Sequence, residues 1–323
     1  MAEIGTIRTG IAPPPAVRIA VILPCYNEEV AIAKVVGDFR AMLPNAAIYV
    51  FDNNSLDRTR EIAARAGALV RREHQQGKGH VVARAFADVE ADVYVLVDGD
   101  DTYDAAAAPA MVGMLLADRL DMVTGTRVAE IAAAYRRGHR LGNRVLTGAV
   151  RLVFGNRITD MLSGYRVFSR RFVKSFPAMA SGFETETEFT VHALELSMPL
   201  GELEITYRER PMGSASKLRT YVDGIRILRT IFTLVKNERP LEFFSLVGVV
   251  LMTTGLLIGL PVVLEFFATH LVPRLPSAIL ALGLVLLSFL SFANGLVLAS
   301  VARGRKEMKR LAYLAIPATG TAP

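Results

Sequence analysis

Residues 94–104, YVLVDGDDTYD, decide how the whole chain is interpreted, because an apolar run from Tyr94 to Val97 ends abruptly in acidic residues. Such a run is typical of a buried strand in an α/β sheet, and ligands bind outside the carboxyl ends of these strands. The four carboxylates, all within seven residues, repel one another unless a cation lies between them. We therefore expect Mg²⁺ or Mn²⁺ here, with a diphosphate on the open positions of the ion. The alternative is a solvated acidic turn in which Asp104 caps the next helix.

The composition limits the classes of protein to which the chain can belong. Its 323 residues allow one large domain or two smaller units. The single cysteine, Cys25, excludes an intrachain disulfide, and the five histidines lack zinc-ligand spacing. The net charge of +6 suits an anionic membrane surface better than nucleic acid, because no basic tract is interleaved with aromatic residues. Residues 1–16 lack the apolar core of a signal peptide, which predicts a flexible N-terminal leader.

Strands are expected to alternate with helices through the first half of the chain. This alternation predicts an α/β fold with a doubly wound, mostly parallel sheet. The polar clusters follow the strand ends, so they should converge on one rim. The glycine fragments match neither the dinucleotide-binding nor the P-loop pattern, which disfavours a nicotinamide dehydrogenase and a P-loop ATPase. The expected strands are Val17–Leu23, Ala47–Phe51, Ala68–Arg71, Tyr94–Val97, Asp121–Thr124 and Leu203–Tyr207, and the expected helices are Asn27–Met42, Arg58–Ala66, His80–Val89 and Asp104–Leu120.

The second half of the chain becomes basic and then strongly apolar. Residues 217–240 combine apolar positions at helical spacing with several basic residues, which predicts an amphipathic juxtamembrane helix in the headgroup layer. Its alternative is an ordinary helix that faces a core. Two apolar runs, about 241–267 and 275–301, are long enough to cross a bilayer as a hairpin. Their alternative is a pair of buried core helices.

Positive charges around the two apolar runs predict their orientation. Lys236 and Arg239 precede the first run, and a basic tail at 303–323 follows the second. The connecting loop 268–274 carries only Arg274. Because positive loops stay inside, we expect a two-span membrane protein with both termini and the remaining domain in the cytoplasm.

Seven short motifs occur in the order of those in a known family. Over about residues 18–218 the chain resembles a family 2 glycosyltransferase of the polyprenyl-phosphate branch, which is related to dolichyl-phosphate mannose synthase. The paired apolar runs resemble those of the membrane-anchored bacterial type. The motifs are Pro24–Glu28, Asp52–Thr59, Gly77–Gly79, Asp98–Asp100, Gly125–Arg127, Asp160–Arg166 and Ser214–Lys217.

The resemblance implies a GT-A fold over residues 17–216 and a reaction. A sugar would pass with inversion from a UDP- or GDP-sugar to an undecaprenyl- or dolichyl-type phosphate at the cytoplasmic membrane face, giving a polyprenyl-phosphate sugar. By the same resemblance, the nucleotide sugar would contact Pro24, Tyr26, Glu28, Asp52, Asn54, Lys78 and Asp98. Mg²⁺ or Mn²⁺ would bind Asp98 and Asp100, which would be catalytic together with Arg127. Diphosphate and acceptor phosphate would contact Arg127, Arg144, Arg166, Ser214, Ser216 and Lys217.

One departure from the family concerns the metal site. Related enzymes often carry Gln two residues beyond the second aspartate, where this chain has Thr102. This substitution leaves the local metal geometry open. For Tyr26 and Glu28, packing and helix capping are the alternative roles, and for each arginine the alternative is a surface charge or ion pair.

The expected chemistry needs cations more than it needs a base. A phosphate monoester, with a second pKa near about 6, is already largely ionised at neutral pH. Charge that develops on the leaving diphosphate is stabilised by a metal and by preorganised cations. Arginine suits phosphate because its planar fork binds two oxygens and stays charged.

Two other functions compete with sugar transfer to a lipid. One is a non-catalytic membrane scaffold that binds nucleotide sugar or lipid phosphate. The presence of Asp98, Asp100 and the arginines argues against it. A processive polysaccharide synthase would need a Gln-x-x-Arg-Trp motif, and this chain contains no Trp. A homo-oligomer would be compatible with such a membrane anchor.

Overall fold

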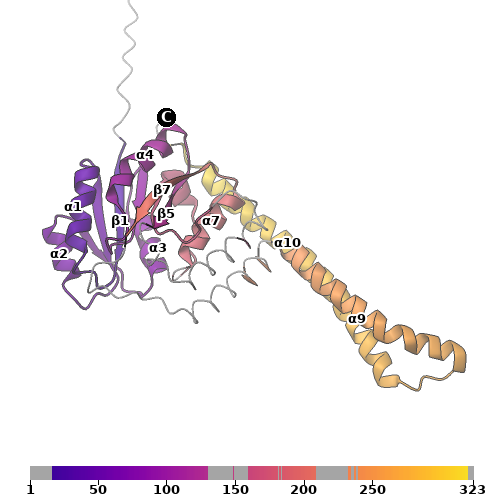
Figure 1. Cartoon of the computed structure of the whole chain (residues 1–323). Coiled ribbons are helices and arrows are strands. Elements are labelled where there is room, and N and C mark those ends of the chain that lie inside the picture. The colour runs from indigo at the N-terminus through magenta and orange to yellow at the C-terminus, as the bar shows by residue number, and fades with distance from the viewer. Residues whose placement is uncertain are drawn as a thin grey trace, which may run out of the picture. The chain divides into compact units, whose positions relative to one another are not determined.

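The computed structural model describes residues 17–129, 148, 159–180, 182, 184–208, 232–233, 236–237 and 239–318. The chain falls into two compact units (Figure 1). The first comprises 1–134, 162–215 and 312–323, and the second comprises 135–161 and 216–311. The first contains the sheet, and the second contains most of two long helices.

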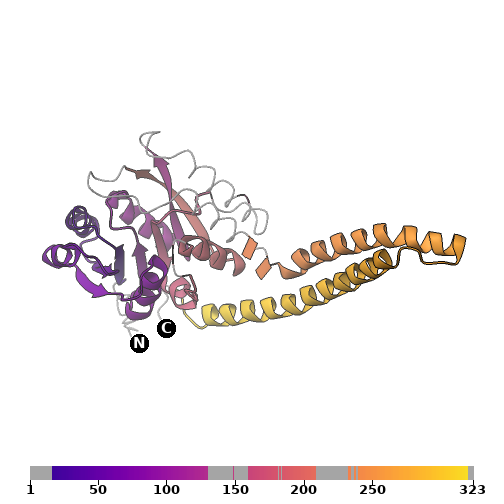
Figure 2. The same ribbon diagram turned by 90° about the horizontal axis from the view of Figure 1, so that it is seen from below.

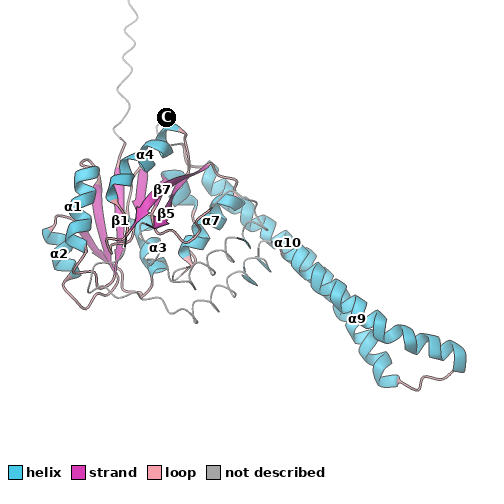
Figure 3. Cartoon of the chain, viewed as in Figure 1, coloured by secondary structure: helices cyan, strands magenta, loops and turns pink. Residues whose placement is uncertain are grey.

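A seven-stranded sheet forms the centre of the first unit (Figure 3). Its order is β3-β2-β1-β4-β6-β5-β7, and only β6 runs antiparallel to its neighbours. The predicted α/β class with a mostly parallel sheet is therefore confirmed. Each predicted strand is present, whereas β6 was not predicted. The strands are β1 (Ile19–Cys25), β2 (Ala47–Asp52), β3 (Leu69–Arg72), β4 (Val93–Leu96), β5 (Met122–Ala129), β6 (Arg166–Ser169) and β7 (Leu200–Tyr207).

Mostly aliphatic side chains fill one face of the sheet. Alternate residues of β1, such as Val21 and Leu23, share this core with helix α1 (Ile32–Met42), because successive side chains of a strand point to opposite faces. Helix α2 (Thr59–Arg65) and helix α4 (Ala108–Ala117) pack on the same core, and a short 3₁₀ helix, η1 (Ala105–Ala107), precedes α4.

Aromatic side chains fill the opposite face. Phe168 of β6 stacks on Phe172 with ring centroids 4.5 Å apart, and it lies 4.8 Å from the ring of Phe189. Phe86 meets the edge of Phe168 at 5.8 Å. The three rings around Phe168 belong to helix α3 (Lys78–Asp88), helix α6 (Arg170–Ser175) and helix α7 (Thr185–Glu195). Helices therefore cover both faces of the sheet, and its polar groups concentrate at the strand ends.

The strand directions bring distant parts of the sequence to one edge of the sheet. The parallel strands β3, β2, β1 and β4 all end there, and β5 ends there as well, because both β4 and β5 are antiparallel to β6. Strand β6 begins at this edge with Arg166. The expected convergence of the polar clusters on one rim follows from this topology.

The beginning of α1 differs from the prediction. We expected Asn27 to cap this helix, but the helix begins at Ile32. Asn27 has a φ of 54°, in the left-handed region that Asn tolerates better than most residues. Its Oδ1 accepts a hydrogen bond from Leu56 N at 2.8 Å, so Asn27 joins two loops. The prediction that Asn27 is a helix cap is therefore wrong.

The second unit contains helix α9 (Pro240–Thr269) and the first 37 residues, 275–311, of helix α10 (Leu275–Leu314). Both helices are long and apolar enough to cross a membrane. They run side by side as a hairpin (Figure 2). Their contacts rely on small residues: a Cβ on Gly255 would lie 3.1 Å from the carbonyl oxygen of Ala281, and Ser291 Oγ donates to the carbonyl of Phe244 at 2.7 Å. Small residues and such hydrogen bonds are typical of helix packing in membranes.

The two long helices extend beyond the predicted apolar runs. Helix α10 continues into the predicted basic tail, through Arg303, Arg305 and Lys306 to Leu314. At the other end of the hairpin, Glu265 pairs with Arg274 at 3.3 Å. Most of the predicted juxtamembrane helix at 217–240 lies outside the described residues.

Candidate active site

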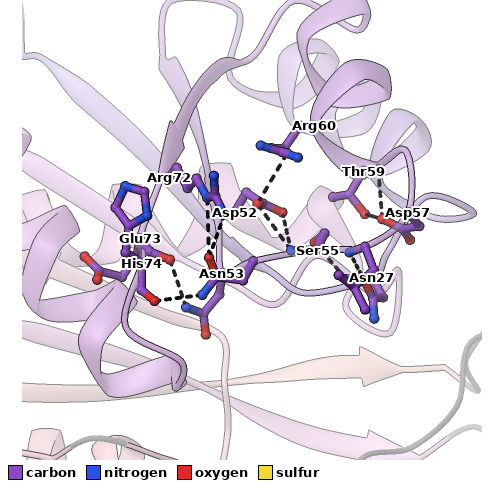
Figure 4. A network of polar contacts seen from close by, with 12 residues as sticks. Asn27, Asp52, Asn53, Ser55, Asp57, Thr59, Arg60, Arg72, Glu73 and His74 are labelled. Carbon is purple, nitrogen blue, oxygen red and sulfur yellow. Dashed lines mark hydrogen bonds and ion pairs between the residues drawn. The ribbon is translucent and has the colours of Figure 1, made fainter.

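The loop after β2 is held against the loop after β1 by short hydrogen bonds (Figure 4). Asn27 N donates to Ser55 Oγ at 2.9 Å, and Glu28 N donates to Thr59 Oγ1 at 2.9 Å. Asp57 accepts from Thr59 N at 3.0 Å. These bonds satisfy backbone groups that regular structure leaves unpaired, so the two loops form one surface at the rim.

The same loop is also attached to the segment after β3. Asn53 Nδ2 donates to the carbonyl of Gln75 at 2.7 Å, and Asn53 Oδ1 accepts from Gly77 N at 2.7 Å. Asn54 Nδ2 donates to the carbonyl of His74 at 2.8 Å. The motif Asp52–Thr59, which resembles a nucleotide-binding element, thus also joins the segments that follow β1, β2 and β3.

Several residues predicted to bind the nucleotide gather on this side of the rim. Pro24 lies near the end of β1, and Tyr26 follows the strand; both are partly buried. Glu28 is buried. Asp52 is the last residue of β2 and is fully buried. Its carboxylate accepts a hydrogen bond from Ser55 N at 3.3 Å, and Arg60 Nε lies 3.6 Å from its Oδ2. Asn54 lies in the loop after β2. Their nucleotide contacts stay a prediction.

The acidic stretch after β4 does not hold four carboxylates around one centre. Asp101 Oδ1 accepts from Lys34 Nζ at 2.7 Å. Asp104 caps η1 through Ala106 N at 3.0 Å and pairs with Arg208 at 2.9 Å. For Asp104 the capping alternative is therefore correct, whereas a cation at Asp98 and Asp100 stays a prediction. Asp98 and Asp100 remain as candidate metal ligands.

Thr102 lies directly against Asp100. Its hydroxyl donates to Asp100 Oδ1 at 2.6 Å, and its backbone N–H lies 3.2 Å from the same oxygen. Both side chains are buried. The residue that departs from the family pattern therefore orients the carboxylate of the second aspartate.

Asp98 belongs to a charged cluster that includes Lys78 and the buried Glu186. Lys78 Nζ lies 2.5 Å from Asp98 Oδ1 and 2.6 Å from Glu186 Oε1. Burial alone would lower the pKa of Lys78, but the two carboxylates hold this pKa well above its usual value. Lys78 is therefore a fixed positive charge. Glu186 was not predicted as a site residue, because the sequence shows it only as one of several acids at the start of a helix.

Gly164 allows Asp98 to reach this position. A Cβ at residue 164 would overlap Asp98 Oδ2 and would lie 3.3 Å from Lys78 Nζ. The backbone N–H of Gly164 donates to the hydroxyl of Tyr103 at 2.9 Å. Burial raises the pKa of Tyr103, so its hydroxyl stays protonated at neutral pH. Both residues shape the site, and neither was predicted to do so.

The structure describes two of the predicted phosphate-binding arginines. Arg127 lies in β5, half-buried, with its guanidinium carbon 5.6 Å from the ring centroid of Tyr207. Arg166 begins β6 and is fully buried; its Nε donates to the carbonyl of Ser163 at 3.1 Å and its Nη1 to Thr190 Oγ1 at 2.9 Å. These contacts give Arg166 a structural role, which differs from the surface charge or ion pair considered as the alternative. Its contact with phosphate stays a prediction.

The remaining predicted residues lie outside the described part of the chain. They are Arg144, Ser214, Ser216 and Lys217.

The described carboxylates fit a metal ion that is bound together with its substrate. Among the described residues, no group of three or more His, Cys, Asp or Glu side chains could hold a metal ion. Mg²⁺ is commonly held by one or two carboxylates and by substrate phosphates, whereas a cage of protein ligands is unusual for it. Asp98 and Asp100 suit this arrangement, because both supply hard oxygen donors just after β4.

Comparisons with known proteins place the chain in a family. The sequence model described as Glycosyl transferase family 2 matches residues 20–176. Glycosyltransferase AglJ of Haloferax volcanii is 33% identical over 92% of this chain and 98% of its own length. Dolichyl-phosphate hexose transferase of the same organism is 29% identical over 68% of this chain and 95% of its own length.

A solved structure has the same fold. Glucosyl-3-phosphoglycerate synthase from Mycobacterium tuberculosis, in complex with Mn²⁺, UDP-glucose and phosphoglyceric acid, matches with a TM-score of 0.55 and 24% identity. The match covers 68% of this chain and 79% of that structure. The match to Glycosyltransferase AglJ over nearly the whole chain agrees with the motifs and with the sheet. The chain therefore belongs to glycosyltransferase family 2.

Proposed function

We propose that the chain transfers a sugar, with inversion, from a nucleotide sugar to a polyprenyl phosphate at the cytoplasmic face of a membrane. The observation that carries this proposal is the combination of a glycosyltransferase domain that has Asp98 and Asp100 at its rim with two helices long enough to cross a bilayer. The similarity to a dolichyl-phosphate hexose transferase supports a lipid phosphate as the acceptor.

Two sets of residues would bind the donor. The loops after β1 and β2 would take the nucleotide, and Asp98 and Asp100 would hold Mg²⁺ or Mn²⁺ on its diphosphate. The bound ion supplies charge stabilisation to the leaving diphosphate. Lys78 is a fixed cation next to Asp98 at 2.5 Å, and it adds positive charge where negative charge develops. The similarly folded synthase from Mycobacterium tuberculosis binds Mn²⁺ and UDP-glucose, which supports this donor class.

The acceptor phosphate would attack the anomeric carbon directly. It is largely ionised at neutral pH and needs no strong base. Arg127, with Arg144, Arg166 and the segment Ser214, Ser216 and Lys217, would orient the two phosphate groups. Attack opposite to the leaving diphosphate inverts the configuration of the sugar.

The hairpin of α9 and α10 would place the domain on the cytoplasmic side. Five basic residues of α10 follow its apolar part: Arg303, Arg305, Lys306, Lys309 and Arg310. In the link between the helices, Arg274 is already paired with Glu265. The asymmetry of positive charge favours a cytoplasmic location for the basic end of α10.

Purified full-length protein in nanodiscs that contain polyprenyl phosphate would test the reaction. We would supply Mg²⁺ or Mn²⁺ and a panel of UDP- and GDP-sugars, and measure a new glycolipid together with released nucleoside diphosphate. One productive donor is expected, and Asp100→Ala should abolish transfer. Nucleotide binding without product from any donor would favour the scaffold instead.

The orientation can be tested with single cysteines, because Cys25 is buried. Leu271→Cys lies in the link and Met308→Cys in the basic part of α10, and both parent side chains are exposed. A membrane-impermeant maleimide added outside sealed, right-side-out vesicles should label Leu271→Cys only. Labelling of Met308→Cys before permeabilisation would contradict a cytoplasmic domain.

A further inference from the structure

We propose that Lys78 is a resident cation of the donor site, which occupies Asp98 until a divalent metal ion takes this carboxylate. We further propose that Glu186 is the positioning residue that keeps the Lys78 ammonium in the site after the exchange. The inference depends on the proposed function only for the divalent metal, and it needs neither a sugar nor a lipid to be tested.

The geometry of the cluster puts one ammonium between two carboxylates. Lys78 Nζ is 2.5 Å from Asp98 Oδ1 and 2.6 Å from Glu186 Oε1. Lys78 is the first residue of α3, Glu186 lies in the first turn of α7, and Asp98 follows β4. Three different elements of the fold therefore hold the cluster together.

The two carboxylates differ in their access to solvent. The Asp98 side chain is 30% exposed, whereas the Glu186 side chain is 6% exposed and Lys78 is 10% exposed. An ion that enters from solvent can therefore reach Asp98 far more easily than Glu186. Asp98 is the exchangeable partner, and Glu186 is the permanent one.

Lys78 and a metal ion would use the same part of Asp98. The ammonium occupies Oδ1, and Oδ2 lies so close to Gly164 that a Cβ there would overlap it. A metal that binds through Oδ1 must displace the ammonium, because two cations cannot share one oxygen at contact distance without strong repulsion.

Glu186 makes this displacement feasible. A buried ammonium that lost its only carboxylate would be strongly unfavourable, but Lys78 keeps the charge-assisted hydrogen bond to Glu186. Glu186 Oε2 is buried and has no hydrogen-bond partner in the described structure. A second acceptor atom is therefore available to the ammonium when it turns away from Asp98. Three N–H donors allow Lys78 to bind both oxygens of Glu186.

The decisive variant is the double substitution Lys78→Met with Glu186→Gln. It removes one positive and one negative charge, so the net charge of the cluster stays the same and only the partly exposed Asp98 loses a charged partner. Mn²⁺ alone would be titrated into the full-length protein in detergent micelles, and the free ion would be followed by EPR. We expect the double variant to bind Mn²⁺ about tenfold more tightly, the gain when Lys78 occupies Asp98 for roughly nine-tenths of the time. Unchanged or weaker binding would overturn the proposal.

Single substitutions separate the two residues. Glu186→Gln removes the permanent partner, so Lys78 should stay on Asp98 and Mn²⁺ should bind about threefold more weakly or worse. Lys34→Met is the matched control, because Lys34 pairs with Asp101 at 2.7 Å in the same acidic stretch. We expect it to change Mn²⁺ affinity by less than about twofold, since exposed charges are screened. Equal effects of Lys34→Met and the double variant would contradict competition at Asp98.

Failure of this inference can be distinguished from failure of the proposed function. A wild-type protein that makes glycolipid, with a double variant that binds Mn²⁺ no more tightly, refutes the role of Lys78 alone. Tighter Mn²⁺ binding by the double variant, in a protein that transfers no sugar to polyprenyl phosphate, supports the role of Lys78 and refutes the proposed acceptor. Far-UV circular dichroism and thermal unfolding of each variant establish that it is folded.

Discussion

The two halves of the rim are built differently. In the half expected to take the nucleotide, side-chain amides and hydroxyls join the loops after β1, β2 and β3, and the carboxylates of Asp52 and Asp57 accept from backbone N–H groups within the loop after β2. In the half expected to take the diphosphate, Asp98, Lys78 and Glu186 form a charged cluster. The hydrogen bonds of the first half form without a ligand, whereas the ion pairs of the second half are ones that a bound ligand can rearrange. We therefore expect substitutions in the first half to change binding and those in the second to change the reaction.

Asp100→Asn should have the largest effect, because it removes a charge from the proposed metal site while it keeps the size of the side chain. We expect kcat to fall by about 10²- to 10³-fold, the usual loss when one preorganised stabiliser of developing charge is removed. Release of nucleoside diphosphate at saturating donor measures this.

Asp104→Asn is the matched control for that substitution. Asp104 lies in the same acidic stretch, but it caps η1 and pairs with the partly exposed Arg208. Asn caps a helix about as well as Asp, so we expect activity within about threefold of wild type. A comparable loss in both variants would mean that the whole stretch acts electrostatically and that Asp100 has no special role.

Gly164→Ala tests whether the diphosphate half depends on close packing. The added methyl group would overlap Asp98 Oδ2 and displace the carboxylate. We expect transfer to fall about 10- to 100-fold, since a shift of about 1 Å in a catalytic group can cost this much. Gly113→Ala is the control, because nothing lies within 4 Å of its added Cβ in α4. Equal activity of the two variants would show that the position of Asp98 is not limiting.

Asp52→Asn should affect binding and leave the reaction unchanged. Asp52 is fully buried at the end of β2 and accepts from Ser55 N at 3.3 Å. A hydrogen bond from a ligand to this carboxylate would contribute about 1.5–3 kcal/mol, so we expect the nucleoside diphosphate to bind about tenfold or more weakly. Isothermal titration calorimetry measures the affinity, with Asp57→Asn in the same loop as the control. A large fall in kcat at saturating donor would break the division between the two halves.

Much of the fold could be predicted because strand signals are local. Apolar runs such as Val17–Leu23 predicted every parallel strand, although β5 continues to Ala129, well beyond its predicted end at Thr124. Strand β6 was missed because its four residues begin with Arg166, and only the neighbouring strands β4 and β5 make such a segment a strand. The start of α1 was misplaced because Asn27 matches a capping residue locally, while its actual partner, Leu56, is 29 residues away.

The site could be predicted only in part, for a related reason. Polar residues after strand ends marked the rim correctly, because parallel strands end at one edge. Their partners could not be inferred: Lys34 and Asp101 are 67 residues apart, and Asp104 and Arg208 are 104 apart. Charge repulsion within one short stretch was therefore an incomplete guide, since distant cations pair with three of its carboxylates, Asp98, Asp101 and Asp104. Glu186 was missed because its contact with Lys78 joins two helices, α3 and α7, that are far apart in the sequence.

Tyr313→Phe should have the smallest effect, and it tests whether a buried carboxylate outside the rim matters only for stability. Asp121 is fully buried; its Oδ1 accepts from Ser169 Oγ at 2.7 Å and its Oδ2 from the hydroxyl of Tyr313 at 2.7 Å. Arg171 lies 4.8 Å from the ring centroid of Tyr313, and a phenyl ring preserves this contact. Loss of the hydroxyl leaves one buried oxygen without this donor, which costs about 1–3 kcal/mol of the free energy of unfolding. Each kcal/mol lowers the Tm of a domain of this size by about 2–4 °C, which thermal unfolding measures.

Transfer and Mn²⁺ binding by Tyr313→Phe should stay at wild-type values, because Asp121 precedes β5 at the sheet edge opposite the rim. If Tyr313→Phe instead lowers kcat as much as Gly164→Ala does, then buried carboxylates affect the reaction through overall rigidity, and the contrast between the two halves of the rim loses its basis.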